Sequence, residues 1–94
     1  DTIKRLKEFI TGSRIYLSVD IDVFDPSVIP GTGTPEPGGI SYRQFLDILQ
    51  ALKNAQFAAA DLVELCPAVD PTGNSAIIAA EVLREMILTA NSND

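Results

Sequence analysis

Two short apolar segments that alternate with three helical patterns constrain the fold of this chain more than any other feature. Residues 14–19 (RIYLSV) and 56–65 (QFAAADLVEL) have the length and side chains of buried strands, although the alanines of the second are also compatible with a helix. Amphipathic spacing predicts helices over 2–11, over 41–53 and from residue 74 to about residue 88. The predicted order is therefore α-β-α-β-α.

Local signals mark where these helices begin and end. Gly12 can take the left-handed conformation that stops the first helix. Ser41 with Gln44 three positions later forms a capping-box pattern, which predicts the start of the second helix. Asn74 or Ser75 is the expected cap of the third helix.

Strands that are apolar on both faces and alternate with helices are typical of a parallel sheet with helices on both faces. Two strands alone leave both sheet edges open, and a chain of 94 residues can build only a small core. The sequence therefore predicts an α/β protein that is part of a larger three-layer parallel sheet. Such a chain is either a piece of a longer protein or a module that needs a partner.

Charge and cysteine content exclude several classes of function. The formal net charge of −6 disfavours nucleic acid and anionic membrane surfaces as partners. No apolar run reaches the roughly 20 residues that span a bilayer, and no signal-peptide pattern precedes the first helix. The single cysteine, Cys66, suits a reducing compartment, and without any histidine to activate it we expect a structural thiol. A cytoplasmic protein is expected.

Acidic side chains follow both predicted strands. Asp20 and Asp22 come directly after the first strand, and no Lys or Arg occurs between Arg14 and Arg43 to neutralise them. A strand period of two predicts that the two aspartates point the same way. Glu64 falls at the matching end of the second strand, and ligands of α/β sheets collect at these ends. We therefore expect three carboxylates at the rim of one crevice.

Two neighbouring carboxylates repel each other unless a cation lies between them. Carboxylate oxygens suit Mg²⁺, Ca²⁺ or Mn²⁺, and an aspartate that bridges two ions is a natural part of a two-metal site. Asp-x-Asp triplets also occur at strand ends as simple turn formers. An EF-hand is excluded because Phe24 stands where a ligand is needed, and "GTGTPEPGG" lacks the Gly-Lys-Ser/Thr ending of a P-loop.

The stretch "SVDIDVFDPSVIPGTGTPEPGG", residues 18–39, closely resembles the signature of the ureohydrolases, the family of arginases, agmatinases and formimidoylglutamases. The resemblance continues through "DLVELCPAVDPTGNSA" and covers roughly residues 14–90. The segments "GTGTPEPGG" and "PAVDPTGNSA" are more similar to agmatinases than to animal arginases. An arginase-like fold is therefore implied.

The resemblance also implies a binuclear manganese hydrolase that cleaves guanidinium or amidino groups and, in arginases and agmatinases, releases urea. Asp20 would bridge both Mn²⁺ ions and Asp22 would bind one of them. Glu64 would face a small cationic guanidino substrate, and Thr34 would line the substrate pocket. No residue of this chain is assigned a catalytic role beyond these, and the family usually forms homo-oligomers.

The chain departs from the family in one large respect. Family members are about three times longer and supply further metal ligands, two histidines and two aspartates, from segments upstream of this motif, whereas this chain has no histidine. Residues 1–94 are therefore expected to be the C-terminal part of a ureohydrolase domain that is inactive without its N-terminal part. The alternatives are a non-catalytic module that docks through its open sheet edge and, less well supported, a phosphotransferase with an Asp-x-Asp motif. Asp25, before Pro26, is expected to be a turn residue.

Overall fold

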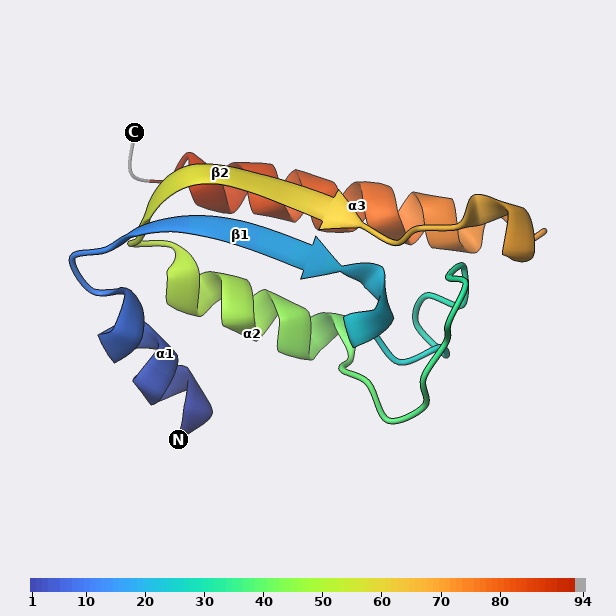
Figure 1. Cartoon of the computed structure of the whole chain (residues 1–94), viewed down its shortest axis with the longest axis horizontal. Coiled ribbons are helices and arrows are strands. Elements are labelled where there is room, and N and C mark those ends of the chain that lie inside the picture. The colour runs from blue at the N-terminus through green and yellow to red at the C-terminus, as the bar shows by residue number, and fades with distance from the viewer. Residues whose placement is uncertain (93–94) are drawn as a thin grey trace.

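A computed structural model describes residues 1–92 and contains three α-helices, two β-strands and two single-turn 3-10 helices (Figure 1). The order is α1 (Thr2–Ile10), β1 (Arg14–Asp20), a 3-10 turn (Ile21–Val23), α2 (Tyr42–Leu52), β2 (Gln56–Val63), a second 3-10 turn (Pro67–Val69) and α3 (Asn74–Ala90). The predicted α-β-α-β-α order is confirmed, including the strand that its alanines had left ambiguous. In residues 1–92, no helix is both long enough and apolar enough to cross a membrane.

The two strands pair in parallel, as predicted, and α2 connects them. The pairing runs from Arg14 opposite Gln56 to Asp20 opposite Val63, with one irregularity after Ile15. The carboxyl ends of both strands therefore lie side by side at one end of the sheet. We call this end the acidic edge, because Asp20, Asp22 and Glu64 lie there or directly after it.

The three helices lie on one face of the sheet. Ile10 of α1, Phe45 of α2 and Val82 of α3 belong to a single hydrophobic cluster, in which Val19 of β1 is also buried. Figure 1 shows α2 running along β1 and α3 running along β2. On the other face of β1, Arg14, Tyr16, Ser18 and Asp20 are exposed. Residues 1–92 thus form a two-stranded sheet with helices on one face, and the second helical layer expected from the sequence is not formed by these residues.

The predicted helix boundaries hold at all six ends, within about two residues, and local contacts account for several of them. The Asp1 carboxylate accepts a hydrogen bond from the amide of Ile3 at 2.9 Å and caps α1. Gly12 has φ of +74°, as expected for the residue that reverses the chain after α1. Ser41 and Gln44 exchange the two hydrogen bonds of a capping box, at 3.0 and 2.9 Å.

Two other details of the prediction are wrong: the end of the second strand and the residue that caps α3. The strand β2 ends at Val63 instead of residue 65, because Glu64 adopts a left-handed conformation with φ of +72° and leaves the sheet. The cap of α3 is neither Asn74 nor Ser75 but Gly73, which has φ of +78°. Gly73 can take this angle without strain, so the following two residues enter the helix and the Ser75 side chain is free for another contact.

Candidate functional site

The two aspartates of the signature stretch lie where the strand β1 gives way to a 3-10 turn. Asp20 is the last residue of β1, whereas Asp22 lies in the 3-10 turn that follows. The carboxylate of Asp20 accepts a hydrogen bond from the amide of Asp22 at 2.8 Å and so caps this turn. The expectation that a strand period of two aligns the aspartates is therefore wrong, because the strand has already ended at Asp20.

Buried apolar residues beside the aspartates hold this turn against the core. Ile21 and Ile29 have no exposed surface, and Phe24 is 1% exposed. The Phe24 ring packs on Phe45 of α2, with ring centres 5.1 Å apart. Because Ile21 is buried in the core, its neighbours Asp20 and Asp22 remain accessible at the sheet edge.

Two threonine hydroxyls bind the carboxylate of Asp22. The Oγ1 atom of Thr32 donates to Oδ1 of Asp22, and Oγ1 of Thr34 donates to Oδ2 at 2.8 Å. Thr32 Oγ1 also accepts a hydrogen bond from the amide of Thr34 at 3.2 Å. Thr32 is buried, and the sequence analysis did not single it out. The Gly-Thr-Gly-Thr segment thus fixes the orientation of Asp22, and Thr34, expected to line a substrate pocket, lies directly at this carboxylate.

Asp25 organises the loop that leaves the turn, as its position before Pro26 predicted. Its carboxylate accepts hydrogen bonds from the amide of Ser27 at 3.0 Å, from the Ser27 hydroxyl, and from the amide of Gly38 at 2.9 Å. The hydrogen bonds from Ser27, followed by that from Gly38, lower the pKa of Asp25 below its usual value. Asp25 is therefore a structural residue that joins the two ends of the Pro/Gly-rich loop.

A buried carboxylate, Asp70, lies in the segment between β2 and α3 and is linked to the same loop through Ser75. Its Oδ2 atom accepts hydrogen bonds from the amide and the hydroxyl of Ser75, at 2.9 and 2.5 Å. Its Oδ1 atom accepts two more from the amide and hydroxyl of Thr72, at 3.2 and 2.6 Å. These bonds, those from Ser75 first, lower the pKa of Asp70 to about 2. Nothing in the sequence singled out Asp70, and Ser75 was expected only as a helix cap.

Glu64, the first residue after β2, has a left-handed backbone conformation with φ of +72°. It is the only non-glycine residue in the described part of the chain with a positive φ, and its side chain is exposed. Left-handed conformations cost a residue with a Cβ roughly 1–2 kcal/mol, and such residues cluster at functional sites. Glu64 directly follows Val63, the partner of Asp20 across the strands.

Another carboxylate, Asp61, lies on the exposed face of the sheet and was also missed. It accepts a hydrogen bond from the Tyr16 hydroxyl and one from the Ser18 hydroxyl at 2.6 Å. The hydrogen bond and the negative charge of Asp61 raise the pKa of Tyr16, whereas the Ser18 and Tyr16 hydrogen bonds lower the pKa of Asp61. These contacts tie β1 to β2 on the face that the helices leave open.

The donor set at the acidic turn fits a hard divalent cation. Asp20 and Asp22 supply carboxylate oxygens, and within residues 1–92 the ion pairs are made by Arg84, far along the chain, so no Lys or Arg neutralises them. However, the described residues bring together no group of three or more His, Cys, Asp or Glu side chains that could hold a metal ion. This agrees with a metal role for Asp20 and Asp22 alone, and the expectation that Glu64 shares one crevice with them stays a prediction. A metal pair here needs additional ligands from outside residues 1–92.

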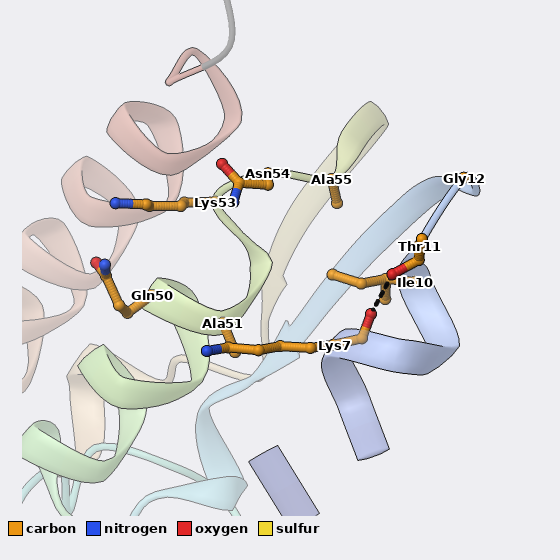
Figure 2. Close-up of a pocket in the computed structure, with 9 residues that line it drawn as sticks. All are labelled: Lys7, Ile10, Thr11, Gly12, Gln50, Ala51, Lys53, Asn54 and Ala55. Atoms are coloured by element: carbon orange, nitrogen blue, oxygen red, sulfur yellow. Dashed lines mark hydrogen bonds between the residues drawn. The ribbon is translucent and has the colours of Figure 1, made fainter. Parts of the chain in front are cut away.

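One hollow of the surface lies at the opposite end of the sheet. Figure 2 shows it between the last turn of α1, with Lys7 and Ile10, and the segment after α2, with Lys53 and Asn54. The hydrogen bond drawn there runs from the Thr11 hydroxyl to the Lys7 carbonyl at 2.8 Å. No carboxylate lines this hollow, so it is unrelated to the acidic edge.

Comparison with known proteins assigns the chain to a family. Residues 1–89 match the family model described as "Arginase family". The chain belongs to the arginase family. This arginase-family chain is 41% identical over 88 residues to an agmatinase of Halalkalibacterium halodurans, and 42% identical over 82 residues to a guanidinobutyrase of Pseudomonas aeruginosa. The alignments cover 92% and 87% of the chain but only 30% and 26% of those two proteins.

Solved structures of the arginase family share its fold. The proclavaminate amidino hydrolase of Streptomyces clavuligerus superposes with a TM-score of 0.88 at 36% identity, over 95% of this chain and 30% of that enzyme. An arginase of Bacillus subtilis superposes with a TM-score of 0.79 at 31% identity, over 90% of this chain and 30% of that enzyme. The α/β fold and the resemblance seen in the sequence are thus confirmed, and the chain spans less than a third of these relatives.

Proposed function

We propose that this arginase-family chain is the C-terminal part of a binuclear manganese hydrolase that cleaves guanidino or amidino C–N bonds, with agmatine or an arginine-like compound as substrate and urea as product. The observation that carries the proposal is the Asp22 carboxylate, held by Thr32 and Thr34 beside Asp20 at the edge where both strands end. The names of the relatives, an agmatinase and a guanidinobutyrase among them, support this class of substrate.

Each acidic residue has a separate part in this proposal. Asp20 would hold both Mn²⁺ ions, as the family resemblance implies; its carboxylate stands at the end of β1 and accepts a hydrogen bond from the Asp22 amide. Asp22 would hold one ion, and Thr34, whose hydroxyl donates to the Asp22 carboxylate, would also line the substrate pocket. When bound, the ion pair lowers the pKa of a coordinated water and so supplies a nucleophile at neutral pH.

Glu64 is proposed to bind the substrate cation. A carboxylate can accept two parallel hydrogen bonds from a planar guanidinium group and so fix its orientation. The left-handed backbone of Glu64 turns the chain out of the sheet immediately after Val63. This conformation supports a role in orienting one side chain toward the site rather than in extending the strand.

The chain on its own is proposed to be inactive. The described residues gather no set of three metal-binding side chains, and two carboxylates alone hold an ion pair weakly. The remaining N-terminal part of the domain is the proposed partner for the open face of the sheet, where Tyr16 is 61% exposed. A homo-oligomer and a cytoplasmic location stay predictions from the sequence.

The test begins with the coding DNA upstream of Asp1, read for several hundred bases. A frame that continues with a histidine and an Asp-x-His-x-Asp segment supports the proposal, whereas a start codon just before the Asp1 codon favours the docking module. The protein as its gene encodes it is then assayed with Mn²⁺ for urea release from agmatine, arginine and guanidinobutyrate. We expect Asp20→Asn to lower urea release more than 100-fold, because a bridging ligand serves both ions. Asp47→Asn, an exposed change on α2, is the matched control.

A further inference from the structure

We propose that Ser75 and Asp70 are positioning residues that orient the Asp22 carboxylate through the loop of residues 31–34. The inference rests on the proposed function, in which Asp22 is a metal ligand. Asp70 lies between β2 and α3, and Ser75 lies in the first turn of α3. Neither side chain is proposed to contact the metal or the substrate.

The loop is anchored at Gly31, where the backbone amide and the backbone carbonyl are both hydrogen-bonded. The amide of Gly31 donates to Oγ of Ser75 at 2.8 Å, and the Gly31 carbonyl accepts from the amide of Cys66 at 2.7 Å. A Cβ atom at position 31 would lie 2.5 Å from Cβ of Ser75, so only glycine fits against this helix. Gly31 directly precedes Thr32, which holds one oxygen of Asp22.

Ser75 is buried completely and its hydroxyl has two defined partners. Its Oγ atom donates to Oδ2 of Asp70 at 2.5 Å and accepts from the amide of Gly31 at 2.8 Å. Asp70 is itself 7% exposed and receives four hydrogen bonds, two from Ser75 and two from Thr72. A contact of this kind joins the first turn of α3 to a loop 44 positions earlier in the chain.

The negative charge of Asp70 sets the direction of this chain of hydrogen bonds. A carboxylate only accepts, so the Ser75 hydroxyl must point its hydrogen at Asp70 and present a lone pair to Gly31. The low pKa of Asp70 keeps it ionised at neutral pH. The chain of contacts runs from Asp70 through Ser75 and Gly31 to Thr32, whose hydroxyl then donates to Asp22.

Residues that orient metal ligands without touching the metal commonly change metal affinity by 10- to 100-fold when they are altered. The test compares Ser75→Ala with Ser41→Ala in the protein as its gene encodes it. Both substitutions remove a serine hydroxyl that accepts one backbone amide hydrogen bond, from Gly31 and from Gln44 respectively. Ser41 lies at the start of α2, where its capping hydrogen bonds are with Gln44. Asp70→Asn is the second variant, because an amide group must turn a donor toward either Ser75 or Thr72.

Two readouts are taken from each variant: amide hydrogen exchange and Mn²⁺ affinity by electron paramagnetic resonance. Ser75→Ala is expected to speed exchange at Gly31 and Thr34 at least tenfold relative to Leu49 of α2, and to weaken Mn²⁺ binding about tenfold. Asp70→Asn is expected to act in the same direction. Ser41→Ala is expected to speed exchange at Gln44 and leave Mn²⁺ binding unchanged.

The outcomes separate this inference from the function on which it rests. Equal Mn²⁺ affinity in the wild-type protein and in both Ser75→Ala and Asp70→Asn overturns the positioning role. So does an acceleration of exchange that is uniform along the chain and the same for Ser75→Ala and Ser41→Ala. A wild-type protein that takes up no Mn²⁺ contradicts the proposed function instead, and the exchange at Gly31 and Thr34 then still decides whether Ser75 holds the loop.

Discussion

Thr34 donates its hydroxyl hydrogen to the carboxylate of Asp22 at 2.8 Å, although 12 positions separate the two residues. The contact makes Thr34 part of the environment of the proposed metal ligand rather than only a wall of a pocket. Together with Thr32 it leaves each oxygen of Asp22 with one hydroxyl partner. A carboxylate oxygen has more than one lone pair, so each can still bind a cation.

Thr34→Val is expected to weaken Mn²⁺ binding about tenfold while the fold is retained, because the side chain is exposed and only its hydrogen bond to Asp22 is lost. Mn²⁺ titration measures the effect. Thr11→Val is the matched control, since Thr11 is also exposed and makes one hydrogen bond, to the carbonyl of Lys7. Equal affinities in the two variants would show that the Thr34 hydroxyl does not support the ligand.

Glu64→Gly is expected to separate stability from function. Glycine adopts a positive φ without steric cost, so the free energy of unfolding should stay unchanged or rise by up to about 1 kcal/mol. The loss of the carboxylate should abolish binding of the guanidino substrate in the protein as its gene encodes it. Urea denaturation and the KM for agmatine test the two halves of this prediction, and Glu64→Gln, which keeps the Cβ, isolates the contribution of the charge. Wild-type substrate affinity in Glu64→Gly would rule out the role proposed for Glu64.

Acid is expected to destabilise the fold as the pH falls from about 4 to about 2. The pKa of Asp70 is lowered from 3.8 to about 2 in the folded chain, so the unfolded chain takes up the proton first and gains stability relative to the fold. The contribution of Asp70 is fully present above pH 4 and is lost as the pH approaches 2. The Tm recorded across this range should therefore fall with decreasing pH.

Asp70→Asn is the control for this acid effect, because an amide does not titrate. The variant should have a lower Tm at pH 5 than the wild type, and its Tm should fall less steeply between pH 4 and pH 2. A residual slope is expected, since Asp25 and Asp61 also have lowered pKa values. Identical slopes in the two proteins would show that Asp70 is not the group that titrates.

Gly39→Ala is expected to destabilise the fold by about 1–3 kcal/mol, because a Cβ there would lie 2.5 Å from the amide nitrogen of Asp25 and 2.7 Å from the carbonyl oxygen of Val23. These are backbone atoms that cannot move away easily. Gly33→Ala is the matched control, since no atom lies within 4 Å of a Cβ at that position and its φ is not positive. Chemical denaturation should show a large loss of stability for the first variant and little for the second.

Features governed by neighbours in the sequence were predictable. The capping box of Ser41 and Gln44, the left-handed Gly12 and the turn role of Asp25 depend on contacts within a few residues, and the structure confirms all three. The signature stretch also led to the arginase family, which the comparison of residues 1–89 confirms. The metal and substrate roles of Asp20, Asp22, Glu64 and Thr34 stay predictions.

Several features that depend on particular contacts between distant segments were not predictable. The alternation of apolar residues gave no sign that β2 stops at Val63, because the conformation of Glu64 is set by its surroundings in the fold. The cap of α3 was assigned to Asn74 or Ser75 by residue type, whereas the Ser75 hydroxyl instead serves Asp70 and Gly31. A hydroxyl that can cap a helix can equally bind a distant loop, and local preference does not distinguish the two.

The sequence by itself determined the order of helices and strands, their parallel pairing and the membership of the family, because hydrophobic periodicity, local capping and a long motif are all properties of neighbouring residues. The tertiary structure alone decided that Asp22 leaves the strand, that Thr32 and Thr34 hold its carboxylate, and that Ser75 anchors their loop. Hydrogen bonds between distant residues form only where packing of the core brings their backbones together, and here the burial of Ile21, Phe24 and Ile29 does so.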